Sequence, residues 1–593
     1  MANRGVSQVI VLKSRQTSAI AMSASKFQSL ATPSSIAAFG ETDKLKNRKQ
    51  FFLQTLAFLM NLHNFWRFPR EAYLKGQGAF VWAYIIVMMS IGSCLLFFEV
   101  ALGQSSSKGY HGVFSLCPIF EGISIVMAIY CTLIAIYHNV INVFSVLYFI
   151  ASFTLDFAQC NNFTRNEECS NGSPNQSSTP EYAFFKYQIL RSPPQYSIGS
   201  LEINWKTLTV LFLLWMAISI AIRRRFSART WPPKFYCPLP FITFAITLIA
   251  ALFIGGASEG LKFMFSCTMK DLCDIVVWRN SAEQAIVSLA IGMGPMITFG
   301  SILKFHTPSD RDSFFLVILV GIATLLCSSI VFSTAGILAE ERKQDIQTVF
   351  NLKQTPNFYG HVEFSQLFTK VTSPLSNCIS VLFFLTLLIA GWYPLVTYVE
   401  SATLICYRYV PWLGKYTLQT TVGFCLLCFI LGSFLLTSNG YYLLTFVDQL
   451  IVTIALSLVV LCELVAVMYI YRLPAFSDDV AFMIGFEPNL YIKIVWVLSP
   501  FVLLGMICTH ITHRSPQRMD LNEKIAVIVG LLIVFTPLVV VGLYNIWVFY
   551  REGNIRKVFS TRAVSSVSSD DIDLPKTVPW FRKVDNGPGP SRA

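Results

Sequence analysis

Residues 54–69, QTLAFLMNLHNFWRFP, place polar side chains in the middle of the first long apolar segment of the chain. The four polar residues there are Asn61, His63, Asn64 and Arg67. Polar and ionisable side chains are costly at membrane depth, so they usually face the interior of a helix bundle or a water-filled path. A second apolar segment is interrupted by glycines at residues 288–294, SLAIGMG. Two interrupted helices in corresponding halves of a chain indicate the central binding site of a transporter.

The composition is that of a membrane protein. Of the 593 residues, 54% are hydrophobic and only 13% are charged. About 20 apolar residues in a helix cross the roughly 30 Å core of a bilayer, and about twelve such runs follow one another here. We therefore expect an all-α membrane protein with about twelve transmembrane helices. The first eight are expected at residues 50–73, 77–99, 123–153, 208–222, 241–255, 282–303, 314–338 and 377–398, and the others fill the chain to residue 550.

Basic residues indicate the orientation in the membrane. The net charge of +12 lies mostly in short loops and tails, which favours a cytoplasmic bias of positive charge over nucleic-acid binding. We expect residues 1–48 to form a cytoplasmic N-terminal tail without a cleavable signal peptide. Residues 49–550 then form the twelve-helix core. Residues 551–593, rich in Ser, Asp, Pro and Gly, are expected to be a disordered cytoplasmic C-terminal tail.

A polar loop at residues 155–204 is expected to lie outside the cell or in a lumen, because three helices precede it. Three glycosylation sequons begin in this loop, at Asn162, Asn171 and Asn175. Sequons are used only in such compartments. Cys160 and Cys169 lie in the same loop, and we expect them to form a disulfide there. The protein is therefore expected to be a multi-pass protein of the plasma membrane or of a secretory-pathway vesicle.

Three motifs carry a resemblance to a known family. Residues 64–69 (NFWRFP), 75–80 (KGQGAF) and 97–104 (FFEVALGQ) closely resemble the neurotransmitter:sodium symporters, which are sodium- and chloride-dependent transporters of monoamines, GABA, glycine and neutral amino acids. Residues 256–262 (GASEGLK) look most like the amino-acid branch. The resemblance covers residues 49–550. It implies an inverted five-helix repeat with broken helices 1 and 6, and a substrate held between helices 1, 3, 6 and 8.

The resemblance implies sodium ligands that this chain keeps only in part. The matching positions are Ala57, Leu59, Met60, Asn64, Ser288 and Ala390. At the first site, Val320 stands where the family has an asparagine. At the second site, Tyr393 and Pro394 replace Asp or Thr followed by Ser. We expect weak or altered sodium binding, because a small cation leaves water only when nearly all of its hydration shell is replaced.

A chloride site is better preserved by the same comparison. Its donors would be Tyr84, Gln284, Ser288 and Thr324. The alternative is that these side chains make ordinary hydrogen bonds between helices, which contribute about 0.6 kcal/mol each in membrane proteins. Bound or transported sodium and chloride are the only ions implied, and no organic cofactor is expected.

The substrate pocket departs most from the family. Its implied lining is Asn61, His63, His138, Val287, Ala290 and Met293. Asn61 and His63 stand where amino-acid transporters carry glycines, whose open backbone receives the substrate carboxylate. His138 takes the place of a tyrosine on helix 3 that contacts that carboxylate. Gly292 and Gly294 still allow the break in helix 6.

Two gates are implied on either side of the pocket. Arg67 and Asp448 match the salt bridge of the outer gate, although a purely structural pair is the alternative. The basic residue of the inner gate is missing, and its acidic partner falls near Arg408. Glu41 or Asp43 could therefore meet Arg408 with reversed polarity, unless Arg408 is an ordinary cytoplasmic basic residue.

Two classes of function remain. The first is a secondary active transporter of a small, amino-acid-like organic solute with altered ion coupling. The second is a transport-inactive member that serves as a binding, trafficking or regulatory subunit. Since an imidazole has an ordinary pKa of about 6.5, protonated His63 or His138 could supply the charge that sodium supplies elsewhere; neutral imidazoles that bridge helices are the alternative. No cluster typical of an enzyme is present, so the expected partners are the bilayer, the solute and inorganic ions.

Overall fold

The structure is a computed structural model. It describes residues 48–159, 179–191, 203–223, 236–349, 360–372, 374–437, 440–449, 454–513 and 521–552. Seven residues named in the sequence analysis lie outside these ranges: Glu41, Asp43, Cys160, Asn162, Cys169, Asn171 and Asn175. The disulfide and the glycosylation sites therefore stay predictions, as do both tails.

All regular secondary structure of the described residues is helical, apart from one isolated bridge between Ile203 and Thr437. Nine of its helices are long and apolar enough to cross a membrane, and the bent pair Pro238–Leu252 (α12) and Ala257–Phe265 (α13) makes ten if it is one span. The predicted spans 1 and 6 are not among these, because each is divided into two shorter helices. The expected all-α membrane fold is confirmed.

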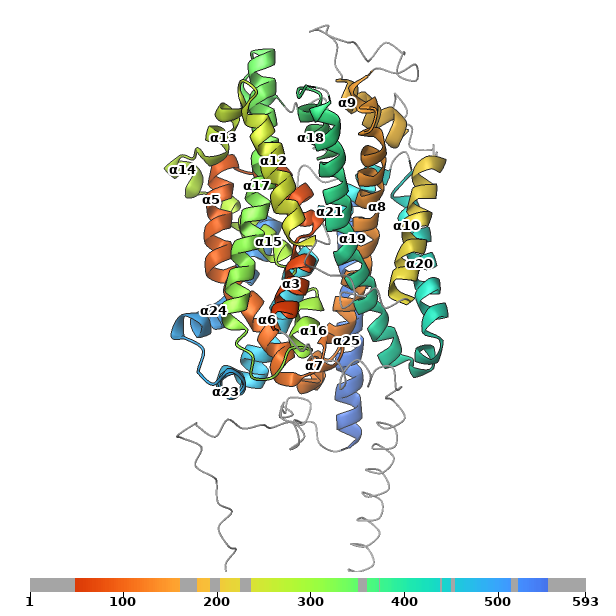
Figure 1. Ribbon diagram of the computed structural model, residues 1–593. Coiled ribbons are helices and arrows are strands. Elements are labelled where there is room, and N and C mark those ends of the chain that lie inside the picture. Colours follow the sequence, from red (N-terminus) through yellow and green to blue (C-terminus); the bar gives the residue numbers. More distant parts are fainter. Residues whose placement is uncertain are drawn as a thin grey trace, which may run out of the picture.

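The unbroken spans surround the broken ones (Figure 1). They are α5 (Gln77–Val87) with α6 (Ser93–Ser106), α8 (Ile123–Ala151), α10 (Trp205–Arg223), α17 (Asp310–Arg342), α19 (Leu375–Tyr409), α20 (Thr417–Phe434), α22 (Leu456–Leu464) continued by a π-helical segment (Val465–Arg472) and α23 (Leu473–Ile484), α24 (Leu490–His513) and α25 (Leu521–Arg551). The longest contact joins α8 and α19, which run side by side. The predicted helix 8 ends at residue 398, whereas α19 ends at Tyr409. Pro394 lies inside both the predicted and the observed helix. Packing against neighbouring helices can support a proline inside a membrane helix.

Both predicted breaks are present. Helix 1 consists of α3 (Arg48–Leu59), a π-helical turn at His63–Arg67, and α4 (Phe68–Leu74). Helix 6 consists of α15 (Ile275–Ser288) and α16 (Pro295–Ser301). Their central segments lie in the middle of the bundle, where α15 contacts the π-helical turn and α16 contacts α3.

Glycine allows the break in helix 6. Gly292 and Gly294 have φ angles of +80° and +97°, which side-chain-bearing residues rarely adopt. A side chain at Gly292 would also overlap Val460 of α22. Ala290, two residues before Gly292, nevertheless adopts a φ of +52°. An alanine in this region costs about 1–2 kcal/mol, so the surrounding packing must hold the break in place.

Candidate substrate and ion site

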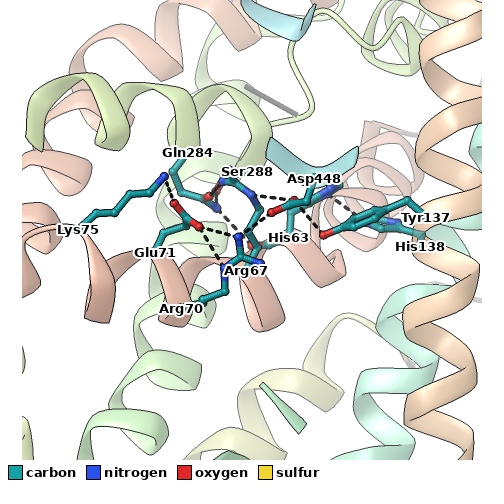
Figure 2. A network of polar contacts seen from close by, with 10 residues as sticks. All are labelled: His63, Arg67, Arg70, Glu71, Lys75, Tyr137, His138, Gln284, Ser288 and Asp448. Carbon is teal, nitrogen blue, oxygen red and sulfur yellow. Dashed lines mark hydrogen bonds and ion pairs between the residues drawn. The ribbon is translucent and has the colours of Figure 1, made fainter. Parts of the chain in front are cut away.

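The two histidines of the predicted pocket meet directly. His63 opens the π-helical turn after the break in helix 1, and His138 lies in the middle of α8. The Nδ1 of His63 is 3.1 Å from the Nε2 of His138 (Figure 2). Both imidazoles are at most 1% exposed. Their other nitrogens, Nε2 of His63 and Nδ1 of His138, have no hydrogen-bond partner among the described residues. The pair can therefore pass a proton between its rings and accept another from outside.

Aromatic side chains and an amide enclose this imidazole pair. The ring of Tyr137 stacks on His63 with 6.0 Å between centroids, and Tyr398 meets His138 edge-on at 5.8 Å. Asn61 is fully buried at the break in helix 1, and neither of its amide atoms has a protein partner in the described chain. These side chains occupy space that glycines would leave open, so the site offers side-chain donors and acceptors in place of a bare backbone.

The structure brings Arg67 and Asp448 together, and it adds two more contacts to the same carboxylate. Arg67 Nε donates to Asp448 Oδ1 at 3.1 Å, and the hydroxyl of Tyr137 donates to the same oxygen at 2.9 Å. Arg70 Nη2 donates to Oδ2 at 2.8 Å. Asp448 lies on α21 (Gly440–Gln449) and is fully buried. The carboxylate of Asp448 thus connects helix 1, helix 3 and α21, which is part of helix 10. It lies next to the imidazole pair, on the side of the outer gate.

Arg70 belongs to a charged group that the sequence analysis did not find. Its Nε donates to Glu71 at 3.2 Å, and Lys75 forms an ion pair with the other oxygen of Glu71 (Figure 2). The guanidinium of Arg70 also lies 5.5 Å from the ring centroid of Trp66. Charged residues within an apolar segment usually pair with one another. That rule could have singled out Arg70 and Glu71 from the sequence.

The four residues predicted to hold chloride lie together: three meet at Ser288, and Thr324 lies next to Tyr84. The Oγ of Ser288 accepts from the Tyr84 hydroxyl at 3.0 Å and from Gln284 Nε2 at 3.2 Å. The side-chain oxygen of Gln284 accepts from Arg67. The hydroxyl of Thr324 donates to Val320 on its own helix, at 2.8 Å. The cluster is internally hydrogen-bonded, so it serves either as an interhelical bridge or as a site that rearranges around an anion.

At the first predicted sodium site, the amide nitrogen of Asn64 donates to two carbonyls, and its buried amide oxygen has no hydrogen-bond partner among the described residues. Asn64 Nδ2 donates to the carbonyl of Leu59 at 2.8 Å and to that of Ser288 at 3.2 Å. Buried Val320 adds no oxygen. The amide of Asn64 therefore satisfies carbonyls at both breaks by itself.

The second predicted sodium site lies between α3 and α19, which contact each other. Its remaining candidate ligands are the backbone carbonyls of three buried residues: Ala57, Met60 and Ala390. Tyr393 is also buried, and its hydroxyl has no hydrogen-bond partner among the described residues. Pro394 contributes no side-chain oxygen. Neither Tyr393 nor Pro394 supplies the short side-chain oxygen that the resemblance implies at this site.

The helix 6 residues of the predicted pocket, Val287, Ala290 and Met293, are all fully buried. The carbonyl of Met293 accepts from Cys131 on α8 at 3.0 Å, and its sulfur accepts from the Tyr398 hydroxyl at 3.3 Å. The backbone N–H of Gly292 donates to the carboxylate of Glu99 on α6. Hydrogen bonds from helices 2, 3 and 8 therefore stabilise the break in helix 6.

At the end of the bundle that is expected to face the cytoplasm, the ion pairs differ from the expected one. Arg408 Nη2 lies 2.8 Å from Glu121, in the loop before α8, and Arg408 also donates to the carbonyl of His111. Asn545 on α25 donates to the second oxygen of Glu121 at 3.3 Å. A further ion pair joins Arg48 and Asp312 at 2.7 Å. Arg408 thus has an acidic partner within the described chain, and that partner comes from the loop before helix 3.

Comparison with known proteins agrees with this architecture. The sequence model of the Sodium:neurotransmitter symporter family matches residues 42–552. Sodium- and chloride-dependent glycine transporter 2 of Xenopus laevis is 28% identical over 502 residues, or 77% of this chain and 62% of that protein. Glycine transporter 1 of the same organism is 27% identical over 542 residues, or 86% and 84%.

A third relative is the Sodium- and chloride-dependent GABA transporter ine of Drosophila melanogaster. It is 27% identical over 491 residues, which are 79% of this chain and 51% of that protein. The chain therefore spans less than two thirds of the length of glycine transporter 2 and of ine.

Proposed function

The chain belongs to the sodium:neurotransmitter symporter family, and from that premise we propose that it is a secondary active transporter of a small, amino-acid-like solute whose coupling involves a proton at His63 and His138. It is a multi-pass membrane protein. The observation that carries the proposal is the 3.1 Å contact between the two buried imidazoles beside the break in helix 1. The glycine and GABA transporters among its relatives support the solute class.

The negative charge of a bound solute would favour a proton in place of a sodium ion. A carboxylate in a water-excluded site needs a positive neighbour, because an unpaired buried charge is very costly. The Asn64 amide bonds two carbonyls that would otherwise face a cation. An imidazolium at His63 would restore positive charge at the break in helix 1. The free Nε2 of His63 could then donate to the solute carboxylate.

We propose that ion pairs on either side of the pocket form its two gates. Arg67, Arg70 and Asp448 would close the outer path, and Arg48–Asp312 with Arg408–Glu121 would close the inner one. The cluster around Ser288 is proposed to hold chloride when the Tyr84 and Gln284 donors turn toward an anion. Both tails are proposed to lie in the cytoplasm.

One observation favours a second candidate function. Asn61 and His63 fill space at the break in helix 1, and the buried Tyr393 stands where the family has a short oxygen ligand. A chain with a filled pocket could serve as a binding, trafficking or regulatory subunit that transports nothing.

Uptake into proteoliposomes tests the proposal. The purified full-length protein would be offered radiolabelled amino acids, while sodium, chloride and pH gradients are imposed separately. We expect uptake of at least one amino acid that an inward proton gradient stimulates and that persists without sodium. Uptake that requires sodium and ignores the proton gradient would contradict the proposed coupling. Absence of uptake under every gradient would favour the transport-inactive candidate.

A further inference from the structure

A row of buried polar side chains follows α8 outward from the imidazole pair. His138, Asn142 and Ser145 are spaced four and three residues apart, so they share one face of the helix. All three are fully buried within a mostly apolar segment. At the outer end of the row, the Oγ of Ser145 lies 2.9 Å from Nε2 of His361 on α18 (His361–Phe368), part of the loop before α19.

The middle of this row has unused hydrogen-bonding capacity. Neither amide atom of Asn142 has a hydrogen-bond partner among the described residues, and the same is true of neighbouring Asn139. Buried polar groups are almost always bonded to protein or to ordered water, and a buried water needs two to four polar partners. A side chain at Gly391 of α19 would overlap the Asn142 amide oxygen. Glycine at that position therefore leaves the amide room between the two helices.

We propose that this row is a hydrated proton path from the outer loop to the His63–His138 pair. The inference rests on the proposed function, since it supplies the proton which that function requires. His361 releases a proton from Nε2 to the Ser145 hydroxyl, which passes its own to water at Asn142. That water protonates Nδ1 of His138, and His138 passes the proton on its Nε2 to Nδ1 of His63. Each intermediate group gains one proton and loses one, so a single charge moves and no other bond changes.

Titratable groups surround both ends of the path. The imidazole pair faces Arg67 and Asp448 from helices 1 and 10, and Tyr137 and Tyr398 from helices 3 and 8. The His361 ring stacks on Tyr148 at 5.4 Å between centroids, Glu363 lies two residues further along α18, and Glu181 also faces Tyr148.

The direct route through the outer gate passes Arg67 and Arg70, which would repel an incoming proton. The path along α8 avoids Arg70, and it meets Arg67 only at its end, where the imidazole pair faces that arginine. It thus separates proton entry from the route through the gate.

A pH jump outside proteoliposomes tests the path. The full-length protein would be followed by time-resolved infrared absorption of imidazole after a step from about pH 7.5 to 6. The infrared signal of the His63–His138 pair is obtained as the difference between the wild type and the double variant His63→Gln/His138→Gln. We expect Asn142→Leu, Ser145→Ala and His361→Phe each to slow that signal at least about tenfold, with its equilibrium midpoint unchanged. His361→Phe keeps an aromatic ring against Tyr148.

Ser152→Ala is the matched control, because Ser152 is a buried serine of the same helical segment whose hydroxyl donates to the Tyr148 carbonyl at 2.7 Å. It should leave the rate unchanged. Wild-type rates in the three path variants, or a shifted midpoint without a slower rate, would overturn the path and leave the proposed coupling intact. A wild-type protein that lacks the pair's signal would overturn both.

Discussion

The Nη2 of Arg70 lies 2.8 Å from Oδ2 of Asp448, while Oδ1 of the same carboxylate accepts from Arg67 and Tyr137. All of these groups are buried. One acid on helix 10 therefore pairs with two guanidinium groups on helix 1. The residual positive charge is shared with Glu71, which pairs with both Arg70 and Lys75.

Removal of the Asp448 carboxylate should lower the free energy of unfolding more than removal of one of its two arginine partners. Asp448→Asn leaves two buried arginines without their carboxylate, and breaking a buried pair in this way costs about 3–5 kcal/mol. Arg70→Gln leaves Asp448 bonded to Arg67 and Tyr137, so we expect a loss of about 1.5–3 kcal/mol. Thermal unfolding in detergent would rank the variants. Lys262→Gln serves as the control, because both side chains of its ion pair with Glu259 are exposed and exposed ion pairs contribute about 1 kcal/mol or less. Equal losses for Asp448→Asn and Arg70→Gln would contradict the shared-acid arrangement.

The inner closure should depend on Glu121. Arg408→Glu places like charges side by side, which should expose the buried thiol of Cys117 in the same loop to an impermeant cytoplasmic reagent. Adding Glu121→Arg restores an opposite pair and should restore protection. A Cys117→Ser background identifies the reacting thiol. If Glu41→Lys or Asp43→Lys rescued the variant and Glu121→Arg did not, the N-terminal tail would hold the true partner.

His111 should make the cytoplasmic layer sensitive to acid. Burial, together with the nearby Arg408 guanidinium, lowers the pKa of His111 from 6.5 to about 4. Between these two pH values the unfolded chain binds more protons, so the stability contributed by neutral His111 is complete above about pH 6.5 and is lost toward pH 4. The side chain is only half-buried, which limits the effect to about 2 kcal/mol. Melting temperatures of the wild type and His111→Gln should converge as the pH falls; a constant difference between them would refute this role.

Much of the fold could be predicted from the sequence because it follows from local features. Runs of apolar residues predicted the spans, polar residues near Asn61 predicted the break in helix 1, and Gly292 and Gly294 predicted the break in helix 6. Each of these signals depends on a chemical property of a short segment. Local rules did not predict the end of α19, which was expected at residue 398 and lies at Tyr409.

The partners within the site could not be predicted in the same way. Arg70 and Asp448 are 378 residues apart, and Arg408 and Glu121 are 287 apart. Which of several nearby charges pair depends on how the helices rotate and pack. Composition and spacing do not specify that rotation. The resemblance to the family supplied Arg67 and Asp448, but it could not supply Arg70.

Hard oxygen ligands at the second sodium site should restore sodium binding. Tyr393 and Pro394 do not provide the short side-chain oxygens that a desolvated sodium ion requires. We expect Tyr393→Asp/Pro394→Ser to raise sodium affinity at least about tenfold, measured as sodium-dependent thermal stabilisation. Tyr393→Phe, which removes only a hydroxyl, should show no gain. Binding of two sodium ions per chain to the unaltered protein would contradict the account.

The pH dependence of uptake or ligand binding tests the central claim most directly, in the wild type and in His63→Gln and His138→Gln. Glutamine keeps a hydrogen bond but cannot be protonated in this range. We predict that wild-type activity changes between about pH 5.5 and 8 and that either variant flattens or shifts this profile. A flat wild-type profile, or two variants that keep the wild-type profile, would contradict a proton on the His63–His138 pair.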